Sequence, residues 1–135
     1  MSAVYPLIRQ QLISWALNAN APAGLAFYAL GVDASYVYSA AHNDLADIAG
    51  ASIVADLHLL DSVTYVNGIL DAADEEWTDL VLTETFDAVI VLLRATDLSS
   101  FLVCYIDSST DGSVPQTVGS TSGLVRWNVA GICKI

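Results

Sequence analysis

Positive charge is scarce in this sequence. Its 135 residues include four lysines and arginines against fifteen aspartates and glutamates, for a formal net charge of −11. Nucleic acid carries a negative charge at every phosphate, so four cations are too few to neutralise its backbone. An anionic membrane surface would repel the chain for the same reason. The charge balance therefore argues against nucleic acid and acidic lipid as partners.

Long apolar runs are also missing. No uninterrupted apolar run exceeds the length of that at residues 88–93, which ends at Arg94, whereas a membrane-spanning helix needs about 20 apolar residues. The N-terminal segment has a single early cation, Arg9, and polar residues such as Gln10 and Gln11 interrupt its apolar positions. A secretion signal has a basic start and a continuous apolar stretch. We therefore expect the chain to be made in the cytoplasm and not to associate with a membrane.

Cysteine is rare as well. Cys104 and Cys133 are the only two, and they are too far apart in sequence for a Cys-x-x-Cys metal or redox motif. Both lie in apolar segments typical of strands. They are either buried thiols that pack as small apolar side chains, or a disulfide between neighbouring strands. The disulfide is favoured if the mature protein functions outside the cell.

The common catalytic motifs are absent. The sequence has no His-Glu-x-x-His, no Gly-x-Ser-x-Gly and no phosphate-binding loop. We interpret His42 as an exposed loop residue, with a hydrated metal site beside Asp44 and Asp47 as the alternative, and His58 as a partly buried strand residue. The acidic residues of 71–76 lack the spacing of a calcium loop and suit a solvated hairpin face. We expect no enzymatic activity, no cofactor and no bound metal.

Apolar residues, by contrast, are abundant. They make up 55% of the chain, charged residues make up 14%, and the mean hydropathy is +0.55. Such a chain is too apolar to be disordered, and its length suits a single domain over residues 1–135. A folded monomer of this mass exposes roughly 6,800 Å², which fifteen acidic and four basic side chains cover thinly. We therefore expect part of the apolar surface to face another protein chain.

Local patterns predict one helix followed by strands. Apolar positions within 5–17 approximate a helical stripe, and Pro6 suits the first turn of a helix. We expect this helix and the loop up to residue 20 to pack on the sheet or on a neighbouring subunit. Asn67-Gly68 predicts a β-hairpin with a type I′ turn, because both residues readily adopt positive φ. Further strands are predicted at 25–30, 52–59, 75–78 with Trp77 inward, 86–95, 101–106, 123–128 and 131–135, the last two paired with each other, and turns at 39–48 and 107–113.

Seven or eight short strands separated by turns indicate a mainly β fold. We predict an antiparallel β-sandwich or small barrel with a short N-terminal helix. Tyr36 and Tyr38, in the loop-like stretch 34–41, are the aromatic residues that we expect to be exposed and to contact a partner. Trp15 and Leu12 of the helix are the other candidate interface residues.

The hairpin and the strands after it resemble a known family. Val63-Thr-Tyr-Val-Asn-Gly-Ile-Leu-Asp-Ala-Ala-Asp74, then Trp77-Thr78, Ala88-Val-Ile-Val91 and Leu102-Val-Cys-Tyr-Ile-Asp107 are similar to small virion structural proteins of tailed bacteriophages. Pro115, Trp127 and Ile132 near the C-terminus fit the same pattern, as do Tyr38-Ser-Ala-Ala-His42 and the acidic positions after it. The likeness covers residues 36–135. Residues 111–123 depart from it, because the family has a more regular proline- and glycine-rich turn there.

The resemblance implies a non-enzymatic virion protein encoded among head and tail morphogenesis genes. Capsid decoration is the main hypothesis, with the major capsid protein as partner, self-association on a symmetry axis and a location at the capsid surface. The alternatives are a tail, neck or fibre-associated component, a host-surface or glycan-binding module that uses Tyr36, Tyr38 and other loop aromatics, and an unrecognised hydrolase. The family pattern names no catalytic residues.

Overall fold

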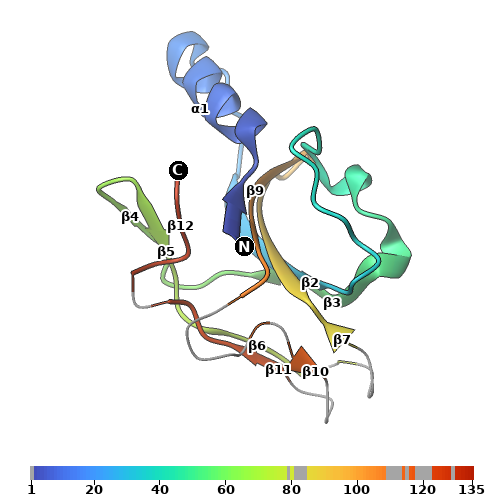
Figure 1. The fold of residues 1–135 in the computed structure, drawn as a ribbon. Helices are drawn as coiled ribbons and strands as arrows, with labels where there is room; N and C mark the ends of the chain where they lie inside the picture. The colour runs from blue at the N-terminus through green and yellow to red at the C-terminus, as the bar shows by residue number, and fades with distance from the viewer. Residues whose placement is uncertain are drawn as a thin grey trace.

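The computed structural model describes residues 2–78, 80, 85–108, 114, 116–117, 123–128 and 130–135. These residues form a mainly β fold of antiparallel sheets with one N-terminal α-helix, as predicted (Figure 1). The accessible surface is 6975 Å², close to the roughly 6,800 Å² expected from the mass. The predicted fold class is therefore confirmed.

A five-stranded antiparallel sheet forms the centre of the fold. Its strand order is β1-β9-β8-β2-β3, so strands distant in sequence are neighbours. β1 is a short N-terminal strand that local patterns did not predict, because it is defined by its pairing with β9. The strands are β1 (Ser2–Val4), β2 (Ala26–Val32), β3 (Ile53–Leu59), β8 (Ala88–Arg94) and β9 (Ser100–Ile106).

Strand β8 explains the uninterrupted apolar run at residues 88–93. Val89 and Val91 pack into one hydrophobic cluster, whereas Ile90 and Leu92 pack into a second cluster on the opposite face of the sheet. Successive side chains of a strand point to opposite faces, so a strand covered on both sides needs apolar residues at every position. The prediction of a central strand here is confirmed.

Three smaller sheets complete the β structure. One has the order β12-β5-β4, another pairs β11 with β6, and the third pairs β10 with β7. The hairpin between β4 and β5 is confirmed, with φ of 53° at Asn67 and 80° at Gly68. Trp77 of β6 is fully buried, as expected. The strands are β4 (Thr64–Val66), β5 (Ile69–Asp71), β6 (Glu75–Trp77), β7 (Thr85–Phe86), β10 (Gln116–Thr117), β11 (Gly123–Val125) and β12 (Cys133–Lys134).

The predicted pairing of the two C-terminal strands is wrong. β11 pairs with β6, and β12 pairs with β5 through Cys133 and Leu70. Gly131, at φ 99°, donates its N–H to the Asn128 carbonyl at 2.8 Å, and the Ile132 N–H then bonds the Leu70 carbonyl at 2.7 Å. The turn thus directs the chain onto the free edge of the hairpin. Most of the turn predicted at 107–113 lies outside the described residues, as does Pro115.

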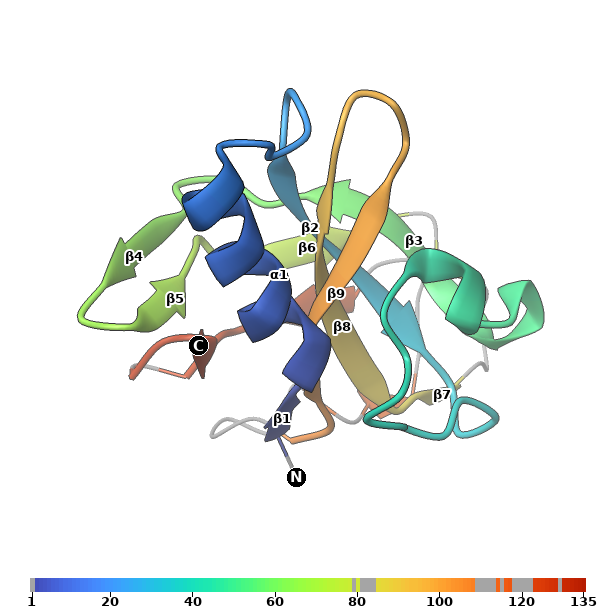
Figure 2. The same ribbon diagram turned by 90° about the horizontal axis from the view of Figure 1, so that it is seen from above.

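Helix and loop cover opposite faces of the central sheet. Helix α1 (Pro6–Asn18) begins with Pro6 in its first turn, as predicted, and buries Ile8 and Trp15 in the first cluster. The segment between β2 and β3, with the 3-10 helices η1 (Leu45–Asp47) and η2 (Gly50–Ser52), covers the second cluster. Figure 2 shows α1 and this segment on either side of β9. No helix in the described part of the chain is long and apolar enough to cross a bilayer.

Candidate interaction surface

Tyr36 is buried, although its loop position predicted that it would be exposed. Only 7% of it is exposed. Its hydroxyl lies 2.7 Å from the Tyr5 hydroxyl and 2.9 Å from His42 Nδ1. Burial raises the pKa of Tyr36. The pKa of Tyr5 is also raised, by burial and by the hydrogen bond between Tyr5 and Tyr36. The predicted exposure of Tyr36 is wrong, because Tyr5 at the start of the helix and His42 in the loop give its hydroxyl two hydrogen-bond partners inside the fold.

Tyr38 also contributes to this aromatic cover. It is half-buried, and its ring centroid lies 5.1 Å from that of Tyr5 and 5.5 Å from that of Tyr105. Aromatic rings at such separations stabilise one another beyond the area they bury. The loop tyrosines therefore close the second cluster, and Tyr38 offers only part of its ring to a partner.

Trp15 and Leu12 lie on the core side of α1 rather than on its free side. The Trp15 ring packs edge-on against Phe101 of β9 at a centroid distance of 4.8 Å. Leu12 is partly buried and packs against the same cluster. Both predicted interface residues thus serve the interface between helix and sheet. The expectation that the helix packs on the sheet is confirmed.

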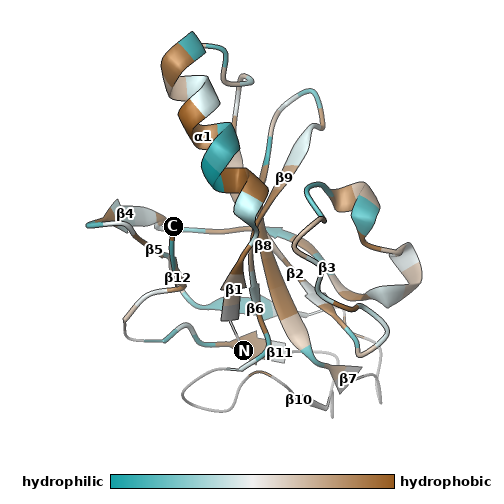
Figure 3. Ribbon diagram, turned by 45° about the horizontal axis from the view of Figure 1, so that its top comes forward, coloured by the Kyte–Doolittle hydropathy of each residue, from teal (hydrophilic) through white to brown (hydrophobic). Residues whose placement is uncertain are grey.

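The outer side of α1 is apolar too. Ile13 is 61% exposed and Leu17 is 80% exposed. Residues four apart lie on one face of a helix, and Ile13 and Leu17 are about half a turn away from Ile8 and Trp15. Figure 3 shows hydrophobic residues along the helix. We call Ile13 and Leu17 the outer face of α1; their spacing was visible in the sequence, but nothing there indicated which side the sheet covers.

Helix α1 itself carries no acidic residue. Asp33 is the first acidic residue of the chain, so all fifteen follow α1 and β2. Within α1 the only charged side chain is that of Arg9, which is exposed. A partner that covers the outer face of α1 therefore desolvates no carboxylate of the helix, and burying a carboxylate without a partner is costly.

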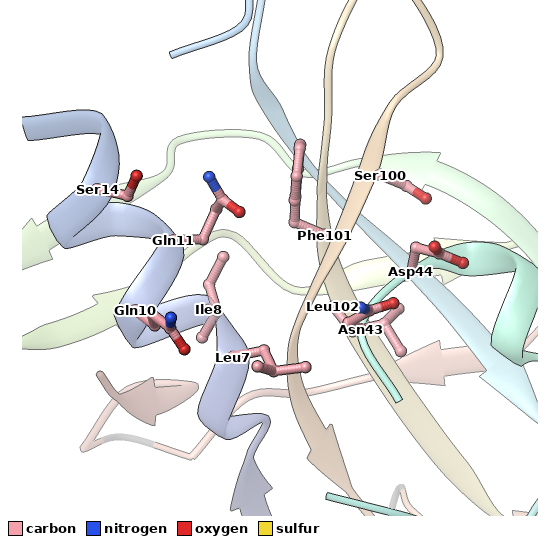
Figure 4. A pocket seen from close by; sticks show the side chains of 10 residues that line it. All are labelled: Leu7, Ile8, Gln10, Gln11, Ser14, Asn43, Asp44, Ser100, Phe101 and Leu102. Carbon is pink, nitrogen blue, oxygen red and sulfur yellow. The ribbon is translucent and has the colours of Figure 1, made fainter. Parts of the chain in front are cut away.

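A groove lies between α1 and β9. It encloses about 280 Å³ and has both apolar and polar walls. In Figure 4, Gln10, Gln11 and Ser14 of α1 lie on one side of Phe101 and Leu102, and Asn43 and Asp44 lie on the other side of β9. The side-chain amides of Gln10 and Gln11 can hydrogen-bond polar or peptide groups of a partner, which makes the groove a second candidate contact on α1.

The hairpin of β4 and β5 exposes a second apolar group. Tyr65 is 58% exposed and Val66 is 63% exposed, and Ile69 is partly exposed beside the turn. This hairpin forms a separate edge of the fold, away from the central sheet (Figure 1). It is a second candidate contact surface.

Both histidines are hydrogen-bonded within the fold. His58 Nδ1 lies 3.0 Å from a Glu75 carboxylate oxygen, and its ring stacks on Trp77 at 5.2 Å. It is partly buried, as expected. His42 is also partly buried, because it is bonded to Tyr36 rather than exposed in a loop. The described residues contain no group of three side chains suited to hold a metal ion.

Carboxylates near these histidines and after the hairpin organise the backbone. Asp47 accepts the N–H groups of Asn43 and Asp44. Those two bonds lower the pKa of Asp47. The bond from Asp44 is one half of the capping box of η1, and the Asp44 side chain, which accepts a backbone N–H of η1, is the other half. Asp74 accepts the Trp127 N–H at 3.0 Å, so the acidic run after the hairpin is more than a solvated face.

Comparison with protein-family models, with curated proteins and with solved structures finds no match to this chain. The geometry of the described residues is therefore what bears on function. It presents an apolar, acid-free helix face beside a groove on an otherwise acidic domain.

Proposed function

We propose that this chain is a non-enzymatic structural protein of a bacteriophage virion, which decorates the capsid by binding the lattice of the major capsid protein. The resemblance of residues 36–135 to small virion proteins supports the class of protein. The outer face of α1 supports docking onto another protein and is the observation that carries the proposal.

The energetics suit a protein partner. Burying an exposed leucine or isoleucine contributes about 1.5–3 kcal/mol, and Ile13 and Leu17 are both available for burial. The net charge of −11 opposes association of free copies with one another. We therefore propose that copies come together around a symmetry axis on the lattice, where contacts with the capsid offset this repulsion.

Stoichiometry in purified particles tests the location. On the order of hundreds of copies per particle are expected for a decoration protein, because a lattice repeats its binding site many times. Roughly a dozen copies or fewer would instead place the chain in the tail, neck or fibres. Quantitative mass spectrometry of intact particles against the major capsid protein gives this ratio.

Rebinding tests the surface. Particles that lack the protein should bind the purified wild-type chain, and the Ile13→Ser, Leu17→Ser double variant should bind at least tenfold more weakly. Val37→Ser is the matched control, because Val37 is also strongly exposed but lies in the loop on the other side of the sheet. Equal binding of the double variant and wild type would refute docking through α1. Affinity for host cells or glycans without affinity for particles would support the host-surface alternative.

A further inference from the structure

The two cysteines meet inside the fold. Cys104 of β9 is fully buried, and Cys133 of β12 is partly buried against the same hydrophobic cluster. The two side chains lie close enough for each thiol to shift the pKa of the other. Strand β1 joins the two sites, because its Val4 pairs with Cys104 and the strand also contacts β12.

We propose that Cys104 and Cys133 are a site of intramolecular oxidation, at which a small disulfide such as oxidised glutathione closes a bond between the central sheet and the sheet of β12, β5 and β4. The thiols are already neighbours in the folded chain, so bond formation needs the sulfur atoms to approach but no strand to change its partner. This inference stands on the cysteine geometry and does not depend on the proposed function.

The environments of the two thiols set the order of events. The interaction with the Cys104 thiol and the nearby charge of Arg9 lower the pKa of Cys133, although burial opposes them. The interaction with the Cys133 thiol and complete burial raise the pKa of Cys104. Cys133, which is also the more accessible residue, is therefore the thiolate that attacks first.

The exchange proceeds in two balanced steps. The Cys133 thiolate attacks one sulfur of oxidised glutathione, which forms a mixed disulfide and releases one glutathione thiolate. Cys104 then gives its proton to that thiolate or to solvent, and its sulfur attacks Sγ of Cys133 and releases the second glutathione. The cysteine pair loses two electrons, and one glutathione disulfide is reduced to two thiols.

The bond would fasten the C-terminal strand. β12 has only two residues, and its strand pairing is with β5. A disulfide to β9 would anchor this strand, and with it the hairpin, to the central sheet. Glutathione keeps such a pair reduced in the cytoplasm, whereas an oxidising medium outside the cell favours the closed form.

Equilibration of the folded full chain in glutathione buffers of increasing oxidised fraction tests the proposal. We expect the monomer to lose two hydrogen atoms by intact mass, to lose reactivity of both thiols toward an alkylating reagent, and to yield one linked peptide pair containing Cys104 and Cys133. Cys104→Ser should instead gain one glutathione at Cys133. Cys133→Ser should keep a thiol that reacts far more slowly.

Two outcomes would overturn the proposal. One is a wild-type chain that keeps both thiols, or carries glutathione at Cys133 with no internal bond, across the whole range of buffers. The other is an internal bond that forms only after unfolding in urea.

The oxidised wild type should also melt several degrees higher than the reduced form, and amide exchange should slow in β12 and β5. Both measurements need only the wild-type chain, so they hold even if a serine variant fails to fold.

Discussion

Gly31 of β2 has no room for a side chain. A Cβ atom at this position would lie 2.1 Å from Cε2, 2.6 Å from Cζ and 2.7 Å from Cδ2 of Phe86. Phe86 is fully buried, and its ring lies 5.5 Å from that of Trp77. Trp77 is held in turn by a 2.7 Å hydrogen bond from its Nε1 to the Asp56 carbonyl. Phe86 therefore cannot move aside without disturbing a second buried ring, and Gly31→Ala should destabilise the fold.

The magnitude follows from two opposing effects. Overpacking a core costs about 1–3 kcal/mol, and the direct contact with a ring edge favours the upper end. Replacing glycine by alanine within a strand recovers about 0.5–1 kcal/mol of backbone entropy. We expect a net loss of about 2 kcal/mol in the free energy of unfolding, or about 8 °C in Tm for a domain of this size.

Urea unfolding followed by tryptophan fluorescence and circular dichroism measures this loss. Gly50→Ala is the matched control, because nothing lies within 4 Å of a Cβ there, and it should change stability by less than about 0.5 kcal/mol. Phe86→Leu removes the Cε2 and Cζ atoms that the new methyl group meets. The double variant should therefore lose about 1 kcal/mol less than the sum of the single variants. A Gly31→Ala chain as stable as wild type, or strict additivity, would refute the reasoning.

Three more predictions concern the turn, the helix and pH. Gly68→Ala should cost about 1–2 kcal/mol in urea unfolding from backbone strain, because φ is +80° and no atom lies closer than 3.8 Å to the new Cβ; no loss would contradict the left-handed turn. Trp15→Ala should cost about 3 kcal/mol or more by removing the ring packed on Phe101, whereas the exposed Leu17→Ala should cost under about 0.5 kcal/mol; equal losses in thermal melts would refute the assigned helix orientation. Burial raises the pKa of Glu75 above its ordinary value of 4.5. The protonated carboxyl therefore stabilises the fold fully below pH 4.5, and this stabilisation is lost as pH rises through the raised pKa of the folded state. Wild type should therefore lose stability relative to Glu75→Gln over that rise, and a constant difference from pH 4 to pH 7 would argue against the shift.

The candidate interface shows where the sequence left a choice open. Helix α1 has apolar residues on two sides, with Ile8 and Trp15 on one and Ile13 and Leu17 on the other. A helical stripe alone could not select between them, because both satisfy the same periodicity. The contact of Phe101 in β9 with Trp15 determines which side of α1 faces the sheet. These two residues are far apart in sequence.

Some elements of this protein were decided by local chemistry. Asn67-Gly68 produced its turn because both residues tolerate positive φ, and Pro6 began the helix because its fixed φ suits a first turn. The apolar run 88–93 became a doubly covered central strand because no position in it is polar. Such signals act within a few residues, so the printed sequence was enough to identify them.

Other features depended on which distant segments met. The edge partners of the two C-terminal strands, the burial of Tyr36 beneath Tyr5 and His42, and the contact of Cys104 with Cys133 were settled only by the packed fold. Each is a contact between segments that are distant in sequence, and local periodicity does not indicate which distant segments come together. The free energy of these contacts comes from burial and hydrogen bonding shared across the core, and so it is defined only once the sheets, helix and loop are in place.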